Sequence, residues 1–384
     1  MKNKLLFSCC FLLFCIGLSA QEGRTELSSA KGIPTKLPYS QMALTAKLLG
    51  AAVSDSSYHS WCVSPIKYNG QYHIFSSRWP VWSKDWGWTS KYANIIHLVS
   101  NKPEGPFSKV GKVLDSYDFP DTTKQFAPHN PRLEKVDGKY IMLYITQNPS
   151  IGNISGMRVG MCIADKLEGP WHFAGGKDGV MVEASKDSTH WTYKSALGTD
   201  NPAFMKIGKK YYIYFKAGMP KQLSARYGYA VSDNLEGPYV KCDAPITDNT
   251  SYIEDAQVFK CDGKYYMLTT DNLGGNTGIF GAIILWESAT GLDFKLKDAK
   301  IALGTLYDYW GNEKQWKELL DKKPFIHNRS GKMERPAILL EKGKPAYFYA
   351  AGDINIHGGK MSEAYVFKIN SKNWNKSLKL IDKK

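Results

Sequence analysis

The architecture of this chain follows from one unit, which reads Glu254-Asp255-Ala256-Gln257-Val258-Phe259-Lys260-Cys261-Asp262-Gly263-Lys264-Tyr265-Tyr266-Met267-Leu268. The unit opens on a charged pair, continues in an apolar run, turns at a glycine and ends in a run rich in aromatic residues. Short runs of this kind on either side of a tight turn are typical of a β-hairpin. We therefore expect two antiparallel strands here, with Gly263 in the turn.

The same unit recurs four more times along the chain. Copies open at His129-Asn130-Pro131, Asp200-Asn201-Pro202 and Glu334-Arg335-Pro336, and a weaker copy opens at Val63-Ser64-Pro65. The turn glycines, at positions 70, 138, 208, 263 and 343, are 68, 70, 55 and 80 residues apart. Self-similarity of this kind marks a repeat architecture. Five units of four short strands predict an all-β fold, a five-bladed β-propeller in which the first strand of each blade lines a central channel.

The N-terminal part of the chain precedes the repeats. Residues 1–20 have two lysines, then an apolar stretch, then a small-residue cleavage site at Ser19-Ala20, which predicts a signal peptide. The apolar stretch is too short for a membrane span. We expect an exported protein, periplasmic or secreted, cleaved near Ala20 and without stable membrane insertion.

The remaining chain divides into a leader and one large domain. Residues 21–55 form a short N-terminal leader with a helix-compatible piece over 41–49, and residues 56–384 form the propeller domain. A leader of this kind either packs outside a ring or supplies the strand that closes it. The spacing of apolar residues over 312–322 predicts a small helical insertion between blades four and five.

Composition narrows the range of partners. The chain has 50 Lys and Arg against 36 Asp and Glu, a formal net charge of +14. A basic exported protein can favour an anionic glycan, although the charge can also serve solubility alone. The lysines are dispersed along the chain, and no known nucleic-acid-binding motif accompanies them, so we expect no nucleic acid partner. No Cys-x-x-Cys or His-Glu-x-x-His pattern is present, and we predict no metal and no cofactor.

Aligning the blades on their turn glycines brings polar residues into two columns. The first column holds His129, Asp200, Glu254 and Glu334, and the second holds Asn130, Asn201, Asp255 and Arg335. The strands that carry these columns converge at one mouth of the channel. Crowded carboxylates cannot all ionise together, so at least one is expected to keep a proton.

A proton-bearing carboxyl beside an ionised one is the equipment of glycoside hydrolysis. We predict catalytic roles for the four acids Glu254, Asp200, Asp255 and Glu334. The alternative for these side chains is to tie blades together by hydrogen bonds, and we favour that role for the two asparagines.

Sugar contacts are predicted from residues around the mouth. The loop after the first hairpin contains four tryptophans within ten residues, and exposed aromatic faces can stack on pyranose rings. The predicted substrate-binding residues are His129, Arg335, Arg78, Trp79, Trp61 and Asp271.

The ordered set His-Asn-Pro, Asp-Asn-Pro-Ala, Glu-Asp and Glu-Arg-Pro, each followed by a Gly-turn hairpin, resembles a known group of enzymes. It is similar to the five-bladed propeller glycoside hydrolases of family 43 and, in the Glu334-Arg335-Pro336 ending, to the related family 117. The resemblance spans roughly residues 58–370. It implies that Glu254 is the general acid and that Asp200 tunes it.

The first blade departs from the family pattern. Family 43 takes its base from a first-blade Asp, whereas residues 59–65 here contain no carboxylate. Asp255, Glu334 and Asp85 are the candidates to supply one, unless the mechanism differs.

The chain is therefore predicted to be an exported, exo-acting glycoside hydrolase that cleaves glycosidic bonds in plant or algal oligosaccharides, which can be neutral or anionic. A glycan-binding propeller without activity is the alternative that the missing Asp supports. A propeller fructosidase or transferase would also need that Asp.

Overall fold

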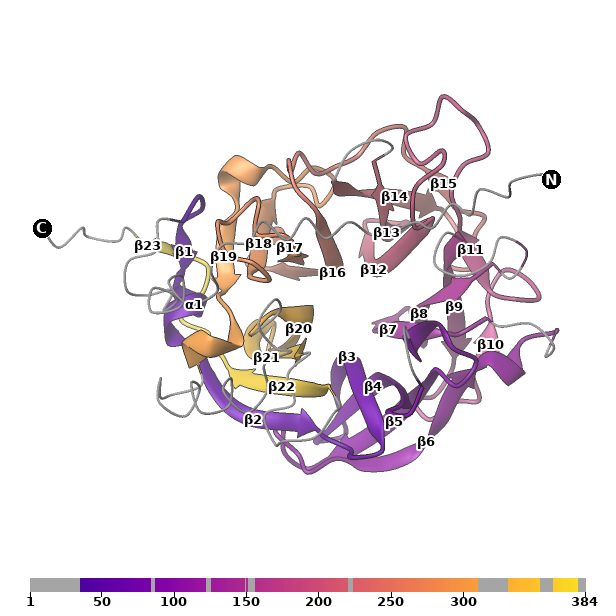
Figure 1. Ribbon diagram of the computed structural model, residues 1–384, viewed down its shortest axis with the longest axis horizontal. Helices are drawn as coiled ribbons and strands as arrows, with labels where there is room; N and C mark the ends of the chain where they lie inside the picture. The colour runs from indigo at the N-terminus through magenta and orange to yellow at the C-terminus, as the bar shows by residue number, and fades with distance from the viewer. Residues whose placement is uncertain are drawn as a thin grey trace, which may run out of the picture.

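The computed structural model describes residues 35–83, 87–121, 126–148, 150, 156–219, 224–309, 331–352 and 362–378. Five sheets are arranged around a common centre, and the strands nearest that centre are β3, β7, β12, β16 and β20 (Figure 1). The predicted all-β, five-bladed propeller is confirmed. The helix expected over 312–322 lies outside the described residues, as do 1–34 and hence the signal peptide. Among the described residues, no helix is long and apolar enough to cross a membrane.

Each blade is an antiparallel meander that runs outward from the centre. Blade one consists of β3 (Tyr58–Tyr68), β4 (Gln71–Pro80), β5 (Asn94–Ser100) and β6 (Ser108–Asp115). Blade two consists of β7 (His129–Val136), β8 (Lys139–Gln147), β9 (Met157–Ala164) and β10 (His172–Phe173), and β11 (Val180–Val182) also pairs with β9. Blade three consists of β12 (Thr199–Ile207), β13 (Lys210–Gly218), β14 (Ala225–Ser232) and β15 (Val240–Lys241).

The last two blades take in both ends of the described chain. Blade four consists of β16 (Ile253–Cys261), β17 (Lys264–Asp271), β18 (Ile283–Ser288) and β19 (Lys300–Leu303), and it is extended by β1 (Tyr39–Ser40) and β23 (Ser377–Leu378). Blade five consists of β20 (Met333–Glu341), β21 (Lys344–Gly352) and β22 (Glu363–Lys368), and it is completed by β2 (Lys47–Val53). The leader thus supplies the outer strand of blade five and closes the ring.

The helix expected over 41–49 is correct only in its first half. The helix α1 (Gln41–Thr45) is capped by the Ser40 hydroxyl, which accepts from the Ala43 amide at 3.3 Å. From Lys47 the backbone instead pairs with β22. Edge pairing along blade five satisfies the backbone groups of this segment, and this tertiary contact outweighs local helix propensity.

Packing between blades supplies the core. Five clusters of buried apolar side chains each join one pair of neighbouring blades, for example Phe75 with Tyr144 between the first two and Tyr266 with Phe348 between the last two. Each blade therefore buries both of its faces, and each face depends on the next blade around the ring.

The five inner strands share one irregularity. Their pairing register shifts at the same point of every copy, between Trp61 and Val63 in blade one and at the equivalent positions of the others. The residue in the shift has a positive φ of 50°, 55°, 49°, 72° and 56° at Cys62, Asn130, Asn201, Asp255 and Arg335. A bulge of this kind leaves one residue unpaired and re-aims its side chain. All five of these residues line the centre of the ring.

Arg132 closes the centre beneath the bulges. It is almost fully buried, and it donates hydrogen bonds of 3.0 Å to the carbonyls of Asp255, Ala256 and Pro336. One side chain of blade two is thus fixed to the backbones of blades four and five. The space between these residues is too small to admit a water molecule. The channel therefore has a floor, and any chemistry must occur at the mouth.

The Arg132→Met variant tests this floor. It leaves three buried carbonyls without their donor, and unpaired buried acceptors cost about 1–3 kcal/mol each before relaxation. We expect the free energy of unfolding to fall by about 3 kcal/mol in urea titrations. The exposed Lys109→Met, which also removes a cation, is the control and should differ little from wild type. Equal stability of both variants would show that Arg132 does not tie the blades together.

Candidate active site

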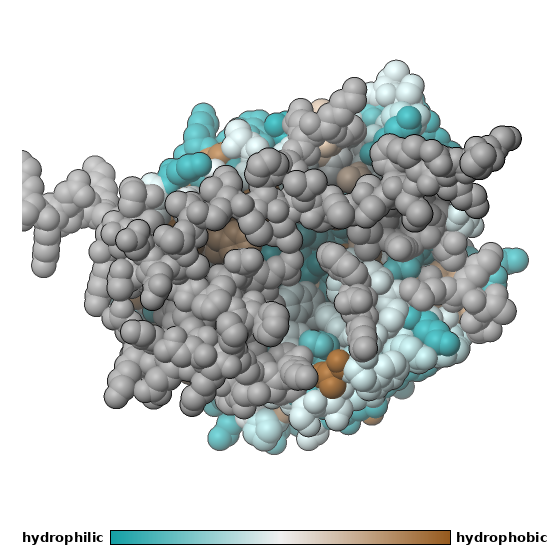
Figure 2. Space-filling view, viewed as in Figure 1, coloured by the Kyte–Doolittle hydropathy of each residue, from teal (hydrophilic) through white to brown (hydrophobic). Residues whose placement is uncertain are grey.

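Two tiers of side chains meet at the mouth because of the bulges. The residues just before the left-handed positions form an upper tier consisting of Trp61, His129, Asp200, Glu254 and Glu334. The left-handed residues form the floor below. Hydrophilic surface is visible in the hollow at the centre of the ring where described residues are uncovered (Figure 2). The columns expected from the sequence are therefore brought together in space, and blade one contributes Trp61 and Cys62 instead of polar residues.

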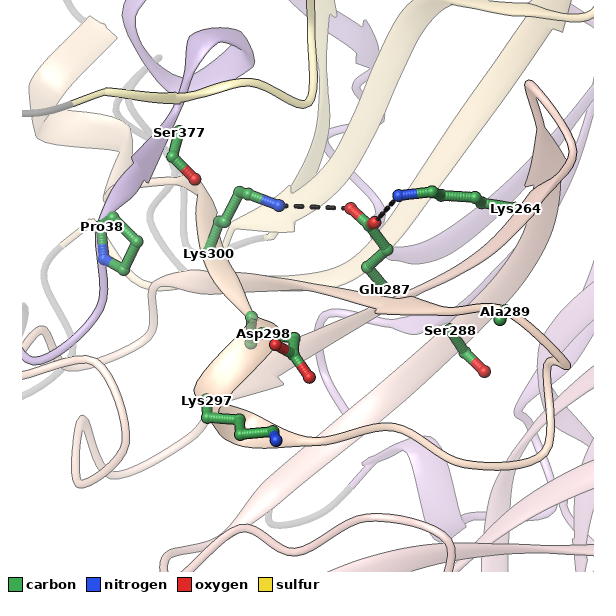
Figure 3. A pocket seen from close by; sticks show the side chains of 10 residues that line it. Pro38, Lys264, Glu287, Ser288, Ala289, Lys297, Asp298, Lys300 and Ser377 are labelled. Carbon is green, nitrogen blue, oxygen red and sulfur yellow. Dashed lines mark hydrogen bonds and ion pairs between the residues drawn. The ribbon is translucent and has the colours of Figure 1, made fainter.

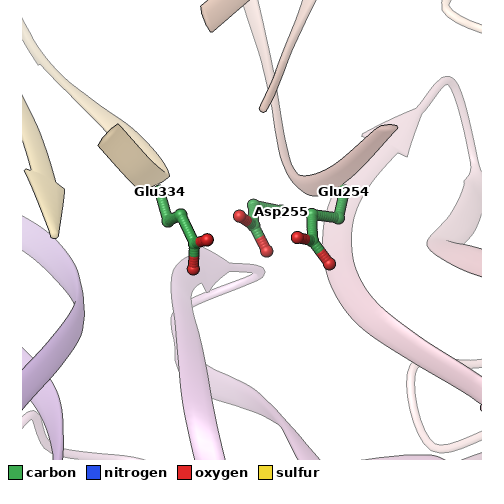
Figure 4. A group of neighbouring side chains, drawn as sticks. All are labelled: Glu254, Asp255 and Glu334. Atoms are coloured by element: carbon green, nitrogen blue, oxygen red, sulfur yellow. The ribbon is translucent and has the colours of Figure 1, made fainter. Parts of the chain in front are cut away.

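Three carboxyl groups form the centre of the site. Glu254, Asp255 and Glu334 each place an oxygen within 4.8 Å of the others (Figure 4). The first two come from β16 and the third from β20. The side chains of Glu254 and Glu334 keep 13% and 11% of their surface exposed, whereas Asp255 has none. Glu254 and Glu334 are therefore the acids of this cluster that a ligand at the mouth can reach.

Lys216, on β13, joins two of the predicted catalytic acids. Its ammonium lies 3.3 Å from Asp200 Oδ2 and 3.1 Å from Glu254 Oε2, and it also lies 3.2 Å from Tyr252 Oη. The side chain is 1% exposed. Sequence reasoning missed this residue, although a lysine inside the buried run of β13 was a signal that it needs a buried partner.

Lys332 holds the other side of the cluster. It forms an ion pair with Glu334 and donates to Asn272 Oδ1 at 2.6 Å, while the Asn272 amide donates to Glu254. Lys332 and Asn272 were also not predicted as site residues from the sequence, because neither falls in a column of the repeat. Cations from β13 and from the residue before β20 thus flank the Glu254 carboxyl group.

Arg335 belongs to the floor. Its Nη1 lies 2.7 Å from Asp255 Oδ1 and also donates to Asn201, and the Asn130 carboxamide oxygen accepts from its Nη2 at 2.7 Å. The interpretation of Asn130 and Asn201 as groups that tie blades together agrees with these contacts. Arg335 was predicted to bind substrate, but its described contacts are with the protein.

These surroundings give the acids different proton affinities. Burial raises the pKa of Asp200 to about 6, with Lys216 opposing the shift and Glu254 adding to it. Burial likewise raises the pKa of Asp255 to about 6 against the pull of Arg335. For Glu254, burial is outweighed by Lys216, Lys332 and Arg335, so its pKa falls to about 2. In the free protein Glu254 is therefore an ionised carboxylate, which differs from the proton-bearing state that a general acid requires.

His129 presents a bare ring nitrogen. Its Nδ1 donates to the Ala127 carbonyl at 2.7 Å, so the neutral ring keeps a lone pair on Nε2. Burial lowers the pKa of His129 to about 3. The Nε2 atom is buried and has no hydrogen-bond partner among the described residues. Because this acceptor is buried, a ligand does not reach it in the described arrangement.

The remaining predicted sugar contacts lie in two different environments. Trp61 and Arg78 are partly exposed, and the Arg78 guanidinium lies 4.1 Å from the centre of the Tyr58 ring. Trp79 is buried on β4, with its ring 5.4 Å from that of His59. Burial does not agree with the predicted platform at Trp79, because the residue is part of the strand and not of the loop that follows. In that loop Trp82 is 62% exposed, and Asp85 lies outside the described residues.

Asp271 has a structural role. It is fully buried and accepts from the Asn276 amide at 3.0 Å, the Thr277 amide at 2.7 Å and the Thr277 hydroxyl at 2.8 Å. Its carboxylate is therefore used inside the protein, which does not agree with the predicted contact to a sugar.

Other places offer weaker sites. Glu254, Asp255 and Glu334 could each give an oxygen to a cation, but protein cations already lie against all three, which favours proton chemistry over a metal. A pocket of about 410 Å³ on blade four holds Glu287 between Lys264 and Lys300 (Figure 3). It lies beside the Gly263 turn, at the opposite end of β16 from Glu254.

The raised pKa of Asp200 predicts a pH dependence of stability. Between its ordinary pKa of 3.8 and about 6 the folded protein binds a proton that the unfolded chain has released, so stability falls as pH rises through this window. Asp200→Asn removes the effect. The difference in unfolding free energy, wild type minus variant, should decrease by about 2 kcal/mol between pH 4 and pH 7 in urea titrations. A difference that stays constant with pH would contradict the raised pKa.

Comparisons with known proteins support the fold. No family model matches the sequence, and no curated protein does either. Among solved structures, the chain is similar to Zg3597, a family 117 glycoside hydrolase of the marine bacterium Zobellia galactanivorans, at 17% identity and a TM-score of 0.61, covering 91% of this chain and 94% of that one.

Two further structures belong to family 43. A Xanthomonas citri enzyme matches at 13% identity and a TM-score of 0.56, over 87% of this chain and 95% of that one, and it has also been solved with xylose and with xylotriose. CoXyl43, a β-xylosidase/α-arabinofuranosidase from a compost metagenome, matches at 14% identity and a TM-score of 0.55, over 90% of this chain and 98% of that one. The chain is a five-bladed β-propeller that matches the glycoside hydrolases of families 43 and 117 in structure at low sequence identity.

Proposed function

We propose that this protein is an exported glycoside hydrolase that removes sugars from the ends of plant or algal oligosaccharides. The observation that carries the proposal is the pair of partly exposed carboxyl groups, Glu254 and Glu334, at the mouth of a propeller shared with families 43 and 117. The closed floor beneath them favours a pocket over a through-channel, and a pocket suits a chain end.

The surrounding cations assign the role of Glu254 in this proposal. Glu254, ionised by Lys216, Lys332 and Arg335, activates water or attacks the anomeric carbon. Glu334, the other partly exposed carboxyl, is assigned the role of proton donor by elimination: it is paired with Lys332 in the free protein and has to take up a proton before it can protonate the leaving oxygen. This reverses the role that the family resemblance implies for Glu254. It also supplies the base that blade one, with Trp61 and Cys62 at the mouth, does not provide.

The buried Asp200 affects the ionisation of Glu254. Asp200 shares Lys216 with Glu254, so a proton on Asp200 changes how strongly the lysine stabilises the Glu254 anion. His129 Nε2 lacks a hydrogen-bond partner among the described residues but is buried, so it would accept from a sugar hydroxyl only if the side chains above it move when the substrate binds. The basic charge of the chain leaves both neutral and anionic oligosaccharides as substrates.

A second candidate function is a glycan-binding propeller without activity. It is favoured by the absence of a carboxylate at the blade-one position and by the saturation of the acids with protein cations. Turnover separates the two candidates.

Hydrolysis of a panel of plant and algal oligosaccharides tests the proposal, with products resolved by chromatography. We expect the wild type to release monosaccharide and Glu254→Gln and Glu334→Gln to lose activity by ~10² or more, the scale of acid-base catalysis. The exposed Glu236→Gln, in a turn of blade three, is the control and should keep wild-type activity. Glycan binding by the wild type without product would instead select the binding propeller.

Lys216→Met tests the charge assignment separately. Loss of this cation raises the pKa of Glu254, so the low-pH limb of the kcat/KM profile should move to higher pH. Lys216→Arg keeps the charge and should leave the limb close to its wild-type position. Thermal unfolding of both variants checks that they fold. Lower activity in Lys216→Met with an unmoved limb would show that the lysine has only a structural role.

A further inference from the structure

The loop that joins β17 to β18 exposes two apolar side chains at the mouth. Leu273 is 51% exposed and Phe280 is 37% exposed. The loop leaves β17 at Asp271, whose strand partner Ile253 directly precedes Glu254. Exposed apolar groups at the edge of a polar site commonly mark ligand contacts.

Internal hydrogen bonds fix the shape of this loop. The Asp271 carboxylate accepts from the backbone amides of Asn276 and Thr277, and the Asp271 carbonyl accepts from the Gly281 amide at 2.9 Å. The Gly278 amide also donates to the Gly274 carbonyl at 2.8 Å. Because the loop is ordered by its own contacts, little conformational entropy remains to be lost when a ligand binds.

Phe280 is connected to both exposed acids through one lysine. The Lys332 ammonium lies 5.6 Å from the centre of the Phe280 ring. The same ammonium pairs with Glu334 and donates to Asn272, which in turn donates to Glu254. Next to the loop, a Cβ added at Gly281 would lie 2.2 Å from Lys332 Cγ. The loop therefore packs closely on the lysine that holds the acids.

We propose that Phe280, supported by Leu273, forms the apolar wall of a sugar-binding subsite beside Glu254 and Glu334. The occupant is a pyranose ring of the oligosaccharide, with its C-H face on the exposed part of the Phe280 ring. The ring attracts the Lys332 cation, and it attracts the weakly positive C-H groups of a sugar for the same reason, its negative face.

The polar groups nearby select a sugar over a protein partner. The partly exposed Asn272 and Glu254 are linked to the apolar wall through the buried Lys332, and they place polar atoms near it for hydroxyl groups. Two exposed apolar side chains are enough for one ring, whereas a specific protein interface needs a much larger surface, about 800 Å² on each partner. This subsite rests on the proposed function in that the bound sugar would be the substrate.

Binding calorimetry with non-hydrolysing Glu254→Gln protein tests the subsite, using the oligosaccharides of the hydrolysis panel. We expect Phe280→Ala, added to this variant, to weaken binding by about tenfold and Phe280→Tyr to retain it, since the tyrosine ring keeps the stacking face. Tyr117→Ala is the matched control, because Tyr117 is 55% exposed on the 3-10 helix Ser116–Asp118 of the β6 to β7 connection. It should bind like its parent. In otherwise wild-type protein, Phe280→Ala should raise KM with little change in kcat.

The outcomes separate the subsite from the hydrolase. Glycan binding that Phe280→Ala weakens, in a protein that cleaves nothing, would support the subsite and reject hydrolysis. Cleavage by the wild type with unchanged binding and KM in Phe280→Ala would overturn the subsite and leave hydrolysis standing. Binding of no glycan by any variant would also overturn the subsite.

Discussion

The left-handed bulge residue, repeated once in each inner strand, is the constraint on which the site depends. A strand without it would alternate its side chains between two faces and bury them between blades. Each bulge leaves one residue of its strand unpaired and redirects the side chain of that residue. The five redirected residues, Cys62, Asn130, Asn201, Asp255 and Arg335, therefore meet at the axis of the ring. Asn and Asp tolerate positive φ better than most residues, which explains why three of the five positions hold them.

The site that results is a balance of buried charge. Bringing acids together in a poorly hydrated place is costly, and each acid here is offset by a cation from another element: Lys216 from β13, Lys332 from before β20 and Arg335 from the floor. The cations do not act equally on the three acids. They lower the pKa of Glu254, whereas burial raises the pKa of Asp200 and of Asp255 despite the neighbouring cations. The same cluster thus contains an ionised carboxylate, Glu254, and two carboxyl groups, Asp200 and Asp255, that keep a proton to higher pH.

The repeat made much of this predictable from the sequence. Asp200, Glu254 and Glu334 occupy one column because each stands eight or nine residues before a turn glycine and directly before the bulge of its inner strand. Lys216 and Lys332 could not be found in this way, because the first reaches the site from the second strand of its blade and the second lies outside the motif. The burial of Trp79 and Asp271 was not foreseen, because both lie at the ends of strands β4 and β17 and local sequence pattern places strand ends poorly.

The pairing of β2 with β22 has a consequence for how the molecule is made. β2 precedes β22 by more than three hundred residues in the sequence, so these two strands can pair only after nearly all of the repeats have been synthesised. Until then blades one and five each present an uncovered apolar face. Ring closure therefore depends on a long-range pairing, and an apolar face left uncovered until that pairing forms is open to aggregation.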